Sequence, residues 1–511
     1  MTMLALDWNA TRVRAVLAAA DEYPLPVALE PPNIDLPTAI SLEHAVPELG
    51  AAALRHCRSA AHQMCQGYLP HLTDTPGRGR LWQAGRHSLG ARDACELVWR
   101  KLHSLSANTE GIVLALPGYL QKSQADALRR LGERAKLPVL GSVPTPLAAA
   151  LAGHVEQFWQ RSVLVIDVDD HALTIGWVKA LADKAHLVEC RSFPKWNAQV
   201  WRERLLNVLA DLCVRQHRRD PRDVPLAEQG LYDQLEPLMD AVSKHQAIQL
   251  GVQGQQWFKH LLVQPEQPAQ FCETLARSVA EAANQLFLCW PASELPRCIL
   301  LTHQAGRLPG LAEALQALVL GSSSADTRLS AQETNYHDDD FGDELMFPES
   351  EERGGGVLVL PAEAPARSAH GLAALFRNGV LPNGHLETIA PLATAPAVDV
   401  GPPRLHFLGR DYPLRDVSFT LGSQFGCQLH FDRSAHPEVA ARHCEISYEP
   451  TAFMLHNRCR EGTWVNDHPV QGAILLQAGD RIRLGPRGPV VRFLGKIAGS
   501  RQQIAGSLNA S

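Results

Sequence analysis

The segment GIVLALPGYLQKSQADALRRLGERAKLPVLGSVPTPLAAALAGH (111–154) alternates apolar strands with helices. Its first apolar run ends at Pro117, and the residues that follow at 124–136 repeat apolar side chains at helical spacing. The same alternation of strands and helices extends through residues 1–390. This pattern predicts an α/β body in which helices cover buried strands.

The pattern changes after a stretch rich in proline and alanine at 391–403, which we interpret as a linker. Residues 404–496 consist of short alternating segments separated by Gly, Asp or Pro, as in an all-β sandwich. We expect a solvated acidic insertion loop at 321–356 and a short tail at 497–511. The predicted fold class is therefore multidomain, with a two-lobed α/β body and a C-terminal β-sandwich.

Composition narrows the function classes. The chain has 511 residues and a net charge of −6, so we expect no nucleic-acid partner and no membrane partner. From its first residues we expect no signal peptide, and no apolar run in the sequence is long enough to span a bilayer. The 11 cysteines show neither CxxC pairs nor the spacing of zinc ligands. We therefore expect a cytoplasmic protein with free thiols and no metal site.

Several segments, in order, resemble the actin/DnaK-type ATPases, to which the 70-kDa heat-shock chaperones belong. LALDWNATRVRAV (4–16) is similar to the first phosphate hairpin of that family, and SVLVIDVDDHALTIGWV (162–178) to the second. CILLTHQAGRLPGLAEAL (298–315) resembles the adenosine motif, and AHGLAALFRNG (369–379) the closing helix. The resemblance covers most of residues 1–390 and implies an actin-like, ribonuclease-H-like ATPase fold.

In that fold, two hairpins hold the ATP phosphates through backbone N–H groups, while glycines allow the close approach and aspartates hold Mg²⁺. The nucleotide-binding candidates that the resemblance implies are Asp7, Asn9, Thr11, Asp167, Asp169, Asp170, Gly306 and Arg307. Several positions depart from the family. Asn9 replaces a glycine of the first hairpin, and Asp169, Asp170 and His171 replace three glycines of the second. Thr145 stands where the family has a glutamate.

We expect these departures to remove productive ATP hydrolysis, because two carboxylates beside the phosphate positions would repel the ligand. No catalytic residue and no cofactor is assigned, and any residual activity would be that of a weak ATPase. An alternative is that Asp7, Asp167, Asp169 and Asp170 bind a divalent cation such as Mg²⁺, which then recruits ATP. A third interpretation makes Asp7 and Asp167 acids that cap turns at strand ends.

The second resemblance lies after the linker. A Leu-Gly turn at 421–422, a Val-x-x-x-His turn ending at His443, a Gly-Thr-x-Val-Asn turn from Gly462 and a Gly-Asp-x-Ile strand at 479–482 have the spacing of forkhead-associated domains. The resemblance covers about residues 404–496. It implies a sandwich that reads phosphothreonine with the loops at one end. The candidate rim residues are Ser423, Arg442, His443, Arg458, Arg460, Gly462, Thr463 and Asn466.

The rim also departs from its family. The phosphate-gripping Arg and Ser positions hold Ser423 and Ala440. The three nearby arginines could still offer guanidinium groups to a phosphate, or form a solvated basic rim. We favour a partner bound without phosphate. The sequence thus predicts a non-catalytic interaction or scaffold protein that binds a protein partner through 404–496. The alternative is an ATP-binding, chaperone-like switch that binds threonine-phosphorylated partners.

Overall fold

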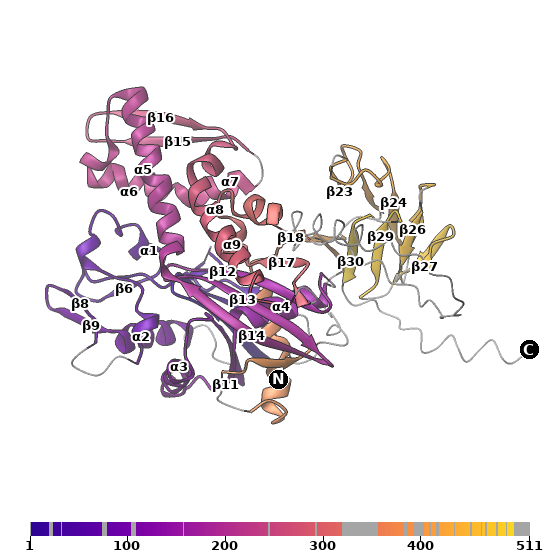
Figure 1. Ribbon diagram of the computed structural model, residues 1–511, viewed down its shortest axis with the longest axis horizontal. Coiled ribbons are helices and arrows are strands. Elements are labelled where there is room, and N and C mark those ends of the chain that lie inside the picture. The colour runs from indigo at the N-terminus through magenta and orange to yellow at the C-terminus, as the bar shows by residue number, and fades with distance from the viewer. Residues whose placement is uncertain are drawn as a thin grey trace, which may run out of the picture. The chain divides into compact units, whose positions relative to one another are not determined.

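The computed structural model describes most of the two regions that the sequence distinguishes (Figure 1). The described residues are 2–19, 24–31, 33–73, 79–103, 109–156, 158–243, 246–291, 294–318, 356–382, 386–392, 403–407, 410–414, 418–433, 435–449, 452–460, 462–465, 468–476, 479–486 and 488–494. The chain divides into two compact units: residues 1–17 with 25–393, and residues 18–24 with 394–511. Most of the expected insertion loop and linker, and the whole tail, lie outside the described residues.

The first lobe of the N-terminal unit is built on a mixed sheet. Its strands, in spatial order, are β11 (Val139–Pro144), β10 (Gly111–Leu116), β1 (Thr2–Trp8), β2 (Arg12–Ala19) and β3 (Leu25–Val27), with β4 (Leu36–Pro37) also paired to β2. All six residues of β10 are buried, because parallel strands lie on both of its sides and helices cover both faces. Helices α2 (Ala91–His103) and α3 (Lys122–Arg134) pack together on this lobe.

The first lobe also carries short elements that the sequence pattern does not show. They are β5 (Ile40–Ser41), β6 (Glu48–Leu49), α1 (Ala51–Leu54), β7 (Met64–Cys65), β8 (Leu81–Ala84), β9 (His87–Gly90), and the 3₁₀ turns Ala61–Gln63 and Leu69–His71. Strands of two to four residues are too short to display a period.

The second lobe is built on another sheet of six strands. Their spatial order is β18 (Gly356–Val359), β17 (Cys298–Leu301), β12 (Ser162–Val168), β13 (Leu173–Leu181), β14 (Lys184–Phe193) and β19 (Ile389–Pro391). Strands β12 and β13 form the antiparallel hairpin that the sequence predicts, and β17 runs parallel to β12.

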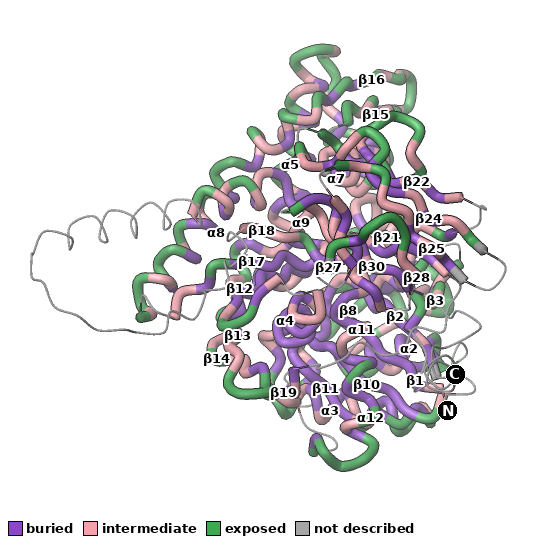
Figure 2. The backbone as a smooth tube through the Cα atoms, turned by 90° about the vertical axis from the view of Figure 1, so that its right-hand side faces the viewer, coloured by how far each residue is buried: buried purple, intermediate pink, exposed green. Residues whose placement is uncertain are grey.

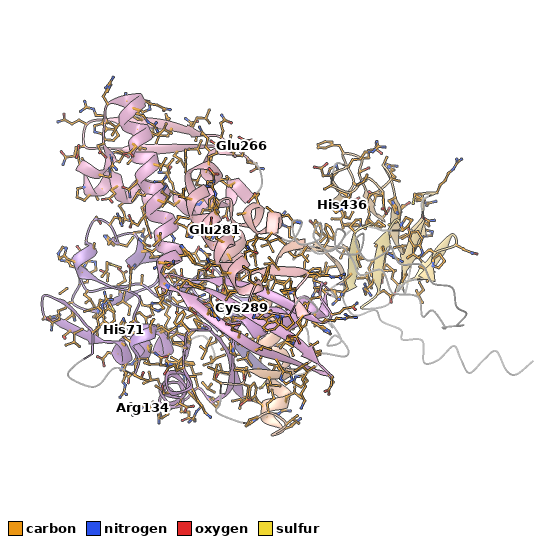
Figure 3. All side chains as sticks on the ribbon, in the orientation of Figure 1. His71, Arg134, Glu266, Glu281, Cys289 and His436 are labelled. Atoms are coloured by element: carbon orange, nitrogen blue, oxygen red, sulfur yellow. The ribbon has the colours of Figure 1, made fainter. Side chains whose placement is uncertain are left out.

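The remaining elements of the second lobe pack on this sheet or extend from it. They are α5 (Ala198–His217), α6 (Pro225–Tyr232), α7 (Leu235–Ser243), β15 (Ile248–Gln253), β16 (Phe258–Val263), α8 (Gln267–Phe287), α9 (His303–Gly306), and the 3₁₀ turns Pro194–Trp196 and Pro221–Asp223. Figure 3 shows α8 descending from Glu266, its N-cap, past Glu281 to Cys289 just beyond its last turn.

Small side chains are frequent in the core between the two sheets. Helices α4 (Thr145–Val155) and α11 (Ala364–Gly371) contact each other, and α4 contacts strands of both sheets. Alanine and glycine dominate α4, and eight of its residues are buried. The strands around it are buried along most of their length (Figure 2). Because small residues allow close packing, the two hairpin turns come near each other.

The C-terminal unit is a sandwich of two sheets. One contains β21 (Arg410–Pro413), β20 (Arg404–Phe407), β30 (Val490–Leu494), β29 (Arg481–Leu484), β26 (Thr463–Val465) and β27 (His468–Pro469). The other contains β23 (Leu429–His430), β22 (Ser418–Gly422), β24 (Cys444–Glu449), β25 (Ala452–Asn457) and β28 (Ala473–Leu475). A cluster of buried apolar residues from both sheets forms its core. Among the helices described in either unit, none is long and apolar enough to cross a bilayer.

Gly141 tests how tightly the first lobe is packed. A methyl group there would lie 2.3 Å from the ring of buried Phe376, on α12 (Ala373–Arg377). We expect Gly141→Ala to destabilise the first lobe by about 1–3 kcal/mol, which should lower the melting temperature of the N-terminal unit. Gly371→Ala is the matched control, since its methyl group meets nothing within 4 Å. Equal melting temperatures for the two variants would contradict this packing.

Candidate functional site

The turn of the first hairpin is closed by its own side chain. Asn9 lies between β1 and β2, and its Oδ1 accepts hydrogen bonds from the backbone N–H groups of Thr11 (3.0 Å) and Arg12 (2.9 Å). Its own N–H donates to the Arg12 carbonyl at 3.0 Å. Asn side chains favour such turns because they replace a backbone acceptor. Two donors of this turn are therefore already occupied, but the N–H of Ala10 points elsewhere.

The Asp169 carboxylate joins the two hairpins. Its Oδ2 accepts the N–H of Ala10 at 2.9 Å and the hydroxyl of Tyr119 at 2.6 Å, both from the first lobe. Its Oδ1 accepts the N–H groups of His171 (2.8 Å) and Ala172 (3.0 Å) in its own turn. Asp169 is only 2% exposed. Burial raises its pKa, while these four hydrogen bonds favour the charged form. The backbone donors of both turns thus hold a side-chain carboxylate.

Asp170 takes part in a second contact between the lobes. Its N–H donates to Thr11 Oγ1 at 3.0 Å, and its carboxylate accepts from Arg202 of α5 at 2.7 Å. Arg202 is itself buried and also pairs with Glu236 of α7 at 3.2 Å. The sequence predicts two carboxylates beside the phosphate positions, and in the structure both Asp169 and Asp170 have partners within the protein. Asp170 is neutralised by an arginine 32 residues away in the chain.

The base of the first hairpin has an ion-pair network of its own. Asp7 accepts from Arg12 Nη1 at 3.1 Å, and Arg12 and Arg14 both approach Asp35. Both arginines are at least nine-tenths buried. The other Asp7 oxygen is buried without a hydrogen-bond partner among the described groups. Asp7 therefore belongs to an internal network rather than to a turn cap.

Asp167 is the buried acid of the second hairpin. It lies on β12 and accepts the Thr302 hydroxyl at 2.8 Å. Burial, together with the nearby charges of Asp7 and Asp169, raises its pKa to about 7, although the hydrogen bond from Thr302 acts in the opposite direction. A carboxyl group that holds its proton near neutral pH is a weak ligand for a cation, because metal ions require the ionised form.

The adenosine-motif residues also face protein groups. Arg307 Nη1 pairs with Glu236 at 2.7 Å and Arg307 Nε with Asp240 at 2.8 Å, both on α7. A methyl group on Gly306 would lie 2.3 Å from Val359, so this glycine serves the packing of α9 on β18. Although burial opposes the shift, Arg202 and Arg307 lower the pKa of Glu236.

Each of the four hairpin carboxylates has its own partner within the protein. Asp7 pairs with Arg12, Asp167 with Thr302, Asp169 with backbone N–H groups and Asp170 with Arg202. In the part of the chain that the structure describes, no group of three or more His, Cys, Asp or Glu side chains is arranged to hold a metal ion. This arrangement gives no support to the divalent-cation alternative.

A further set of contacts joins the lobes at Arg58. Its guanidinium group pairs with Glu203 of α5 and, at 2.6 Å, with Glu228 of α6. Its backbone N–H donates to Gln229 Oε1 at 2.6 Å. A pocket of about 250 Å³ opens beside it, between Trp82 of the first lobe and Tyr232 of the second. We call the contacts of Arg58 with Glu203, Glu228 and Gln229 the Arg58 clasp.

His443 braces the loops of the C-terminal sandwich. The side chain is fully buried, its Nδ1 accepts the N–H of Ala440 at 3.1 Å, and its Nε2 lies 2.9 Å from the Gly462 carbonyl. Because Nδ1 accepts, the proton sits on Nε2 and is donated to Gly462. Thr463 is also buried, and its hydroxyl donates to Asn457 Oδ1 at 2.9 Å. The predicted residues His443, Gly462 and Thr463 thus come together as a framework.

The other rim candidates differ from one another in their contacts. Ser423 Oγ donates to the Val439 carbonyl at 2.9 Å, so this hydroxyl serves the loop itself. Arg458 forms an ion pair with Glu445, with 3.1 Å between Nη2 and Oε2. Arg442 and Arg460 are exposed, and neither forms a hydrogen bond or ion pair with another described residue. Asn466 lies outside the described residues.

Comparison with known proteins agrees with both halves of this geometry. The family model described as "FHA domain" matches residues 409–485. Residues 409–485 form a forkhead-associated domain. The chain is also 28% identical over 179 residues to the chaperone protein DnaK of Deinococcus deserti, covering 32% of this chain and 27% of that protein. The chain therefore spans about a quarter of the length of this relative, and the match supports an Hsp70-like ATPase region.

The two resemblances stated from the sequence are confirmed, and so is the predicted fold class, a multidomain chain with an actin-like body and a forkhead-associated sandwich. Sequence reasoning missed the partners of the Hsp70-like site: Tyr119, Arg202 and Arg58. Tyr119 lies two residues after Pro117, where the first apolar run ends. Arg202 and Arg58 gave no local signal, because their partners are distant in the chain.

The proton on Asp167 of the Hsp70-like region should make stability depend on pH. Its folded pKa of about 7 exceeds the ordinary value of 3.8, so the folded state binds the extra proton and loses stability as pH rises from 4 to 7. Asp167→Asn keeps an oxygen for Thr302 and carries no charge. We expect its stability relative to wild type to rise by about 1–3 kcal/mol over that range, measured by denaturant unfolding. Exposed Asp183→Asn is the control. If the unfolding free energies of wild type and Asp167→Asn changed with pH in parallel, the pKa of Asp167 would not be raised.

Proposed function

We propose that this chain is a non-catalytic protein-interaction or scaffold protein. In this proposal the Hsp70-like body, residues 1–390, is a structural unit that does not turn over ATP, and the forkhead-associated domain, residues 404–496, binds a protein partner. Forkhead-associated domains are protein-interaction modules whose ligands carry phosphothreonine, so a protein partner follows from the domain type. The loss of turnover is argued from the hairpins.

The observation that carries the proposal is the Asp169 carboxylate on the backbone donors of both hairpins. Phosphate oxygens would need those same N–H groups, from Ala10, His171 and Ala172. A nucleotide would therefore have to displace a carboxylate that accepts four hydrogen bonds, each worth about 1.5–3 kcal/mol when the acceptor is charged. It would also bring its own negative charge towards Asp169.

Steric contacts at the second turn support the same conclusion. The His171 ring lies edge-on against the Tyr119 ring, with 4.5 Å between the centroids. Because His171 replaces a glycine of the related ATPases, an imidazole occupies space that a bare backbone would leave open. Burial lowers the pKa of His171, so the ring contributes no lasting positive charge that would attract phosphate.

The two lobes also have protein contacts that replace a bridging nucleotide. Asp169 and Asp170 hold the hairpin turns together, and the Arg58 clasp joins the lobes at a separate place. In an ATPase that opens and closes around its ligand, such contacts would have to break in each cycle. Here they are internal and include partly buried ion pairs, so they favour one closed arrangement.

Nucleotide titration tests the first part of the proposal. With the full chain and Mg²⁺, we expect no ATP binding tighter than about 1 mM by calorimetry, and no phosphate release above blank. We expect Asp169→Gly to bind ATP more tightly than wild type, because it frees the donors of both turns. Asp183→Gly, an exposed acid in the β13–β14 turn, is the matched control. Submillimolar binding by wild type would refute the proposal.

Hydrogen exchange tests the closed lobes. We expect Arg58→Met to speed amide exchange at residues 57–59 and 228–233 by about ten-fold or more, because the clasp then loses both ion pairs. Arg129→Met removes an ion pair within one helix, with Glu133, and serves as control. Unchanged exchange in the Arg58 variant would show that the lobes are held without the clasp.

A further inference from the structure

Phe425 is the most exposed large apolar residue described in the chain. It lies in the loop between β22 and β23 of the forkhead-associated domain and is 97% exposed. Next to it, Gly426 has φ of +103°, a conformation that glycine adopts without strain and that turns the chain at the loop tip. A phenylalanine left in water forgoes about 1.5–3 kcal/mol of burial free energy. The residue has no packing role in the isolated domain.

The loop that carries Phe425 is held firmly. The N–H groups of Ser423 and Gln424 donate to the carbonyls of Ala440 (3.0 Å) and Ala441 (2.9 Å). The Ser423 hydroxyl adds a third bond to the same neighbouring segment. The approach is so close that a methyl group on Gly422 would lie 2.2 Å from the Ala441 oxygen. A side chain on a fixed loop loses little entropy when it is bound, which favours its use as an anchor.

Two cationic side chains share this rim. Arg442 follows directly after the segment that holds the Phe425 loop, and Arg460 lies in the loop whose Arg458 N–H donates to the His443 carbonyl at 3.0 Å. His443 also joins that loop through Gly462. The loops that carry Phe425, Arg442 and Arg460 are therefore linked through one continuous set of hydrogen bonds. Since the described residues provide no anion for Arg442 or Arg460, both can pair with a ligand.

The rim has lost the hydroxyl chemistry that would single out a phosphate. The Ser423 and Thr463 hydroxyls donate inside the domain, to Val439 and Asn457, and position 440 is alanine. Arg458, the third arginine, is already paired with Glu445. What remains for a partner is an exposed aromatic side chain and two arginines, carried by loops that hydrogen bonds link. Carboxylates suit such groups, and a protruding phenyl ring requires an apolar pocket.

We propose that Phe425, Arg442 and Arg460, here named the Phe425 rim, dock an unphosphorylated acidic segment of a protein partner, with Phe425 inserted among apolar side chains of that segment. The inference rests on the proposed partner-binding role of the forkhead-associated domain and does not depend on whether the Hsp70-like body binds ATP. It replaces phosphothreonine, the ligand of the domain type, with carboxylates and an apolar contact.

A random twelve-residue peptide library, displayed on phage and selected on the immobilised full chain, tests the docking. We expect enriched peptides to combine two or more Asp or Glu residues with large apolar residues, and to be lost when Phe425→Ala protein is used. Synthetic versions of these peptides should bind Phe425→Ala and Arg442→Glu about ten-fold or more weakly by fluorescence polarisation. Selection of neutral or basic peptides, or equal binding by Phe425→Ala, would overturn the inference.

Matched variants separate local effects from loss of folding. Tyr448→Ala removes a half-exposed aromatic at the other end of β24, and Arg442→Lys keeps the charge, so both should bind within about three-fold of wild type. Circular dichroism melting should be unchanged for Phe425→Ala, because Phe425 buries nothing.

Two further experiments test whether another kind of ligand binds the Phe425 rim. A threonine-phosphorylated peptide array retained only in its phosphorylated form would overturn the acidic docking while leaving a partner-binding domain in place. No peptide binding of either kind would count against the proposed function itself. Sedimentation of wild type and Phe425→Ala shows whether a second copy covers the rim, and a dimer lost in the variant would replace the inference with self-association.

Discussion

The arrangement of the Hsp70-like body depends on one buried carboxylate, that of Asp169. It accepts hydrogen bonds from Ala10 and Tyr119 of the first lobe and from His171 and Ala172 of its own turn. An ionised group so deeply buried is tolerated only when its hydrogen bonds are fully made. Since half of these donors come from the other lobe, separating the lobes would leave the carboxylate under-satisfied. The same bonds that settle the charge therefore hold the hairpins together.

Beginning at the neighbouring Asp170, charges alternate in sign, which explains how several ionisable groups can lie close together. Asp170 pairs with Arg202, Arg202 with Glu236 and Glu236 with Arg307. Asp167 forms no ion pair with another residue that the structure describes, and its raised pKa of about 7 lets a proton balance its charge. Each anion is thus balanced from within the protein. A nucleotide would enter a site whose donors and cations already have partners.

The α/β body, both hairpins and the sandwich could be predicted because apolar runs, turn residues and motif spacing are local properties of the sequence. The hydrogen bonds and ion pairs within the site could not be predicted. Tyr119 and Arg202 reach the second hairpin across 50 and 32 residues, and Ala10 reaches it across 159. For that reason Asp170 looked like an unpaired repulsive charge when it is in fact neutralised. The short strands between Ile40 and Gly90 were missed because they are too brief to show a period.

In both units, side chains within the loops or beneath them form hydrogen bonds that hold the loops from inside. In the forkhead-associated domain, the buried His443 ring bonds to the loops at Ala440 and Gly462 from inside the domain. In the body, Asn9 and Asp169 brace the hairpin turns from inside. A loop stabilised by its own side chains does not need a ligand to be ordered. Its outward residues are then free to change, and at the Phe425 rim they present a phenyl ring and two arginines. At the hairpins, by contrast, the bracing carboxylate of Asp169 itself occupies the backbone donors of both turns, so these donors point inward and not to solvent.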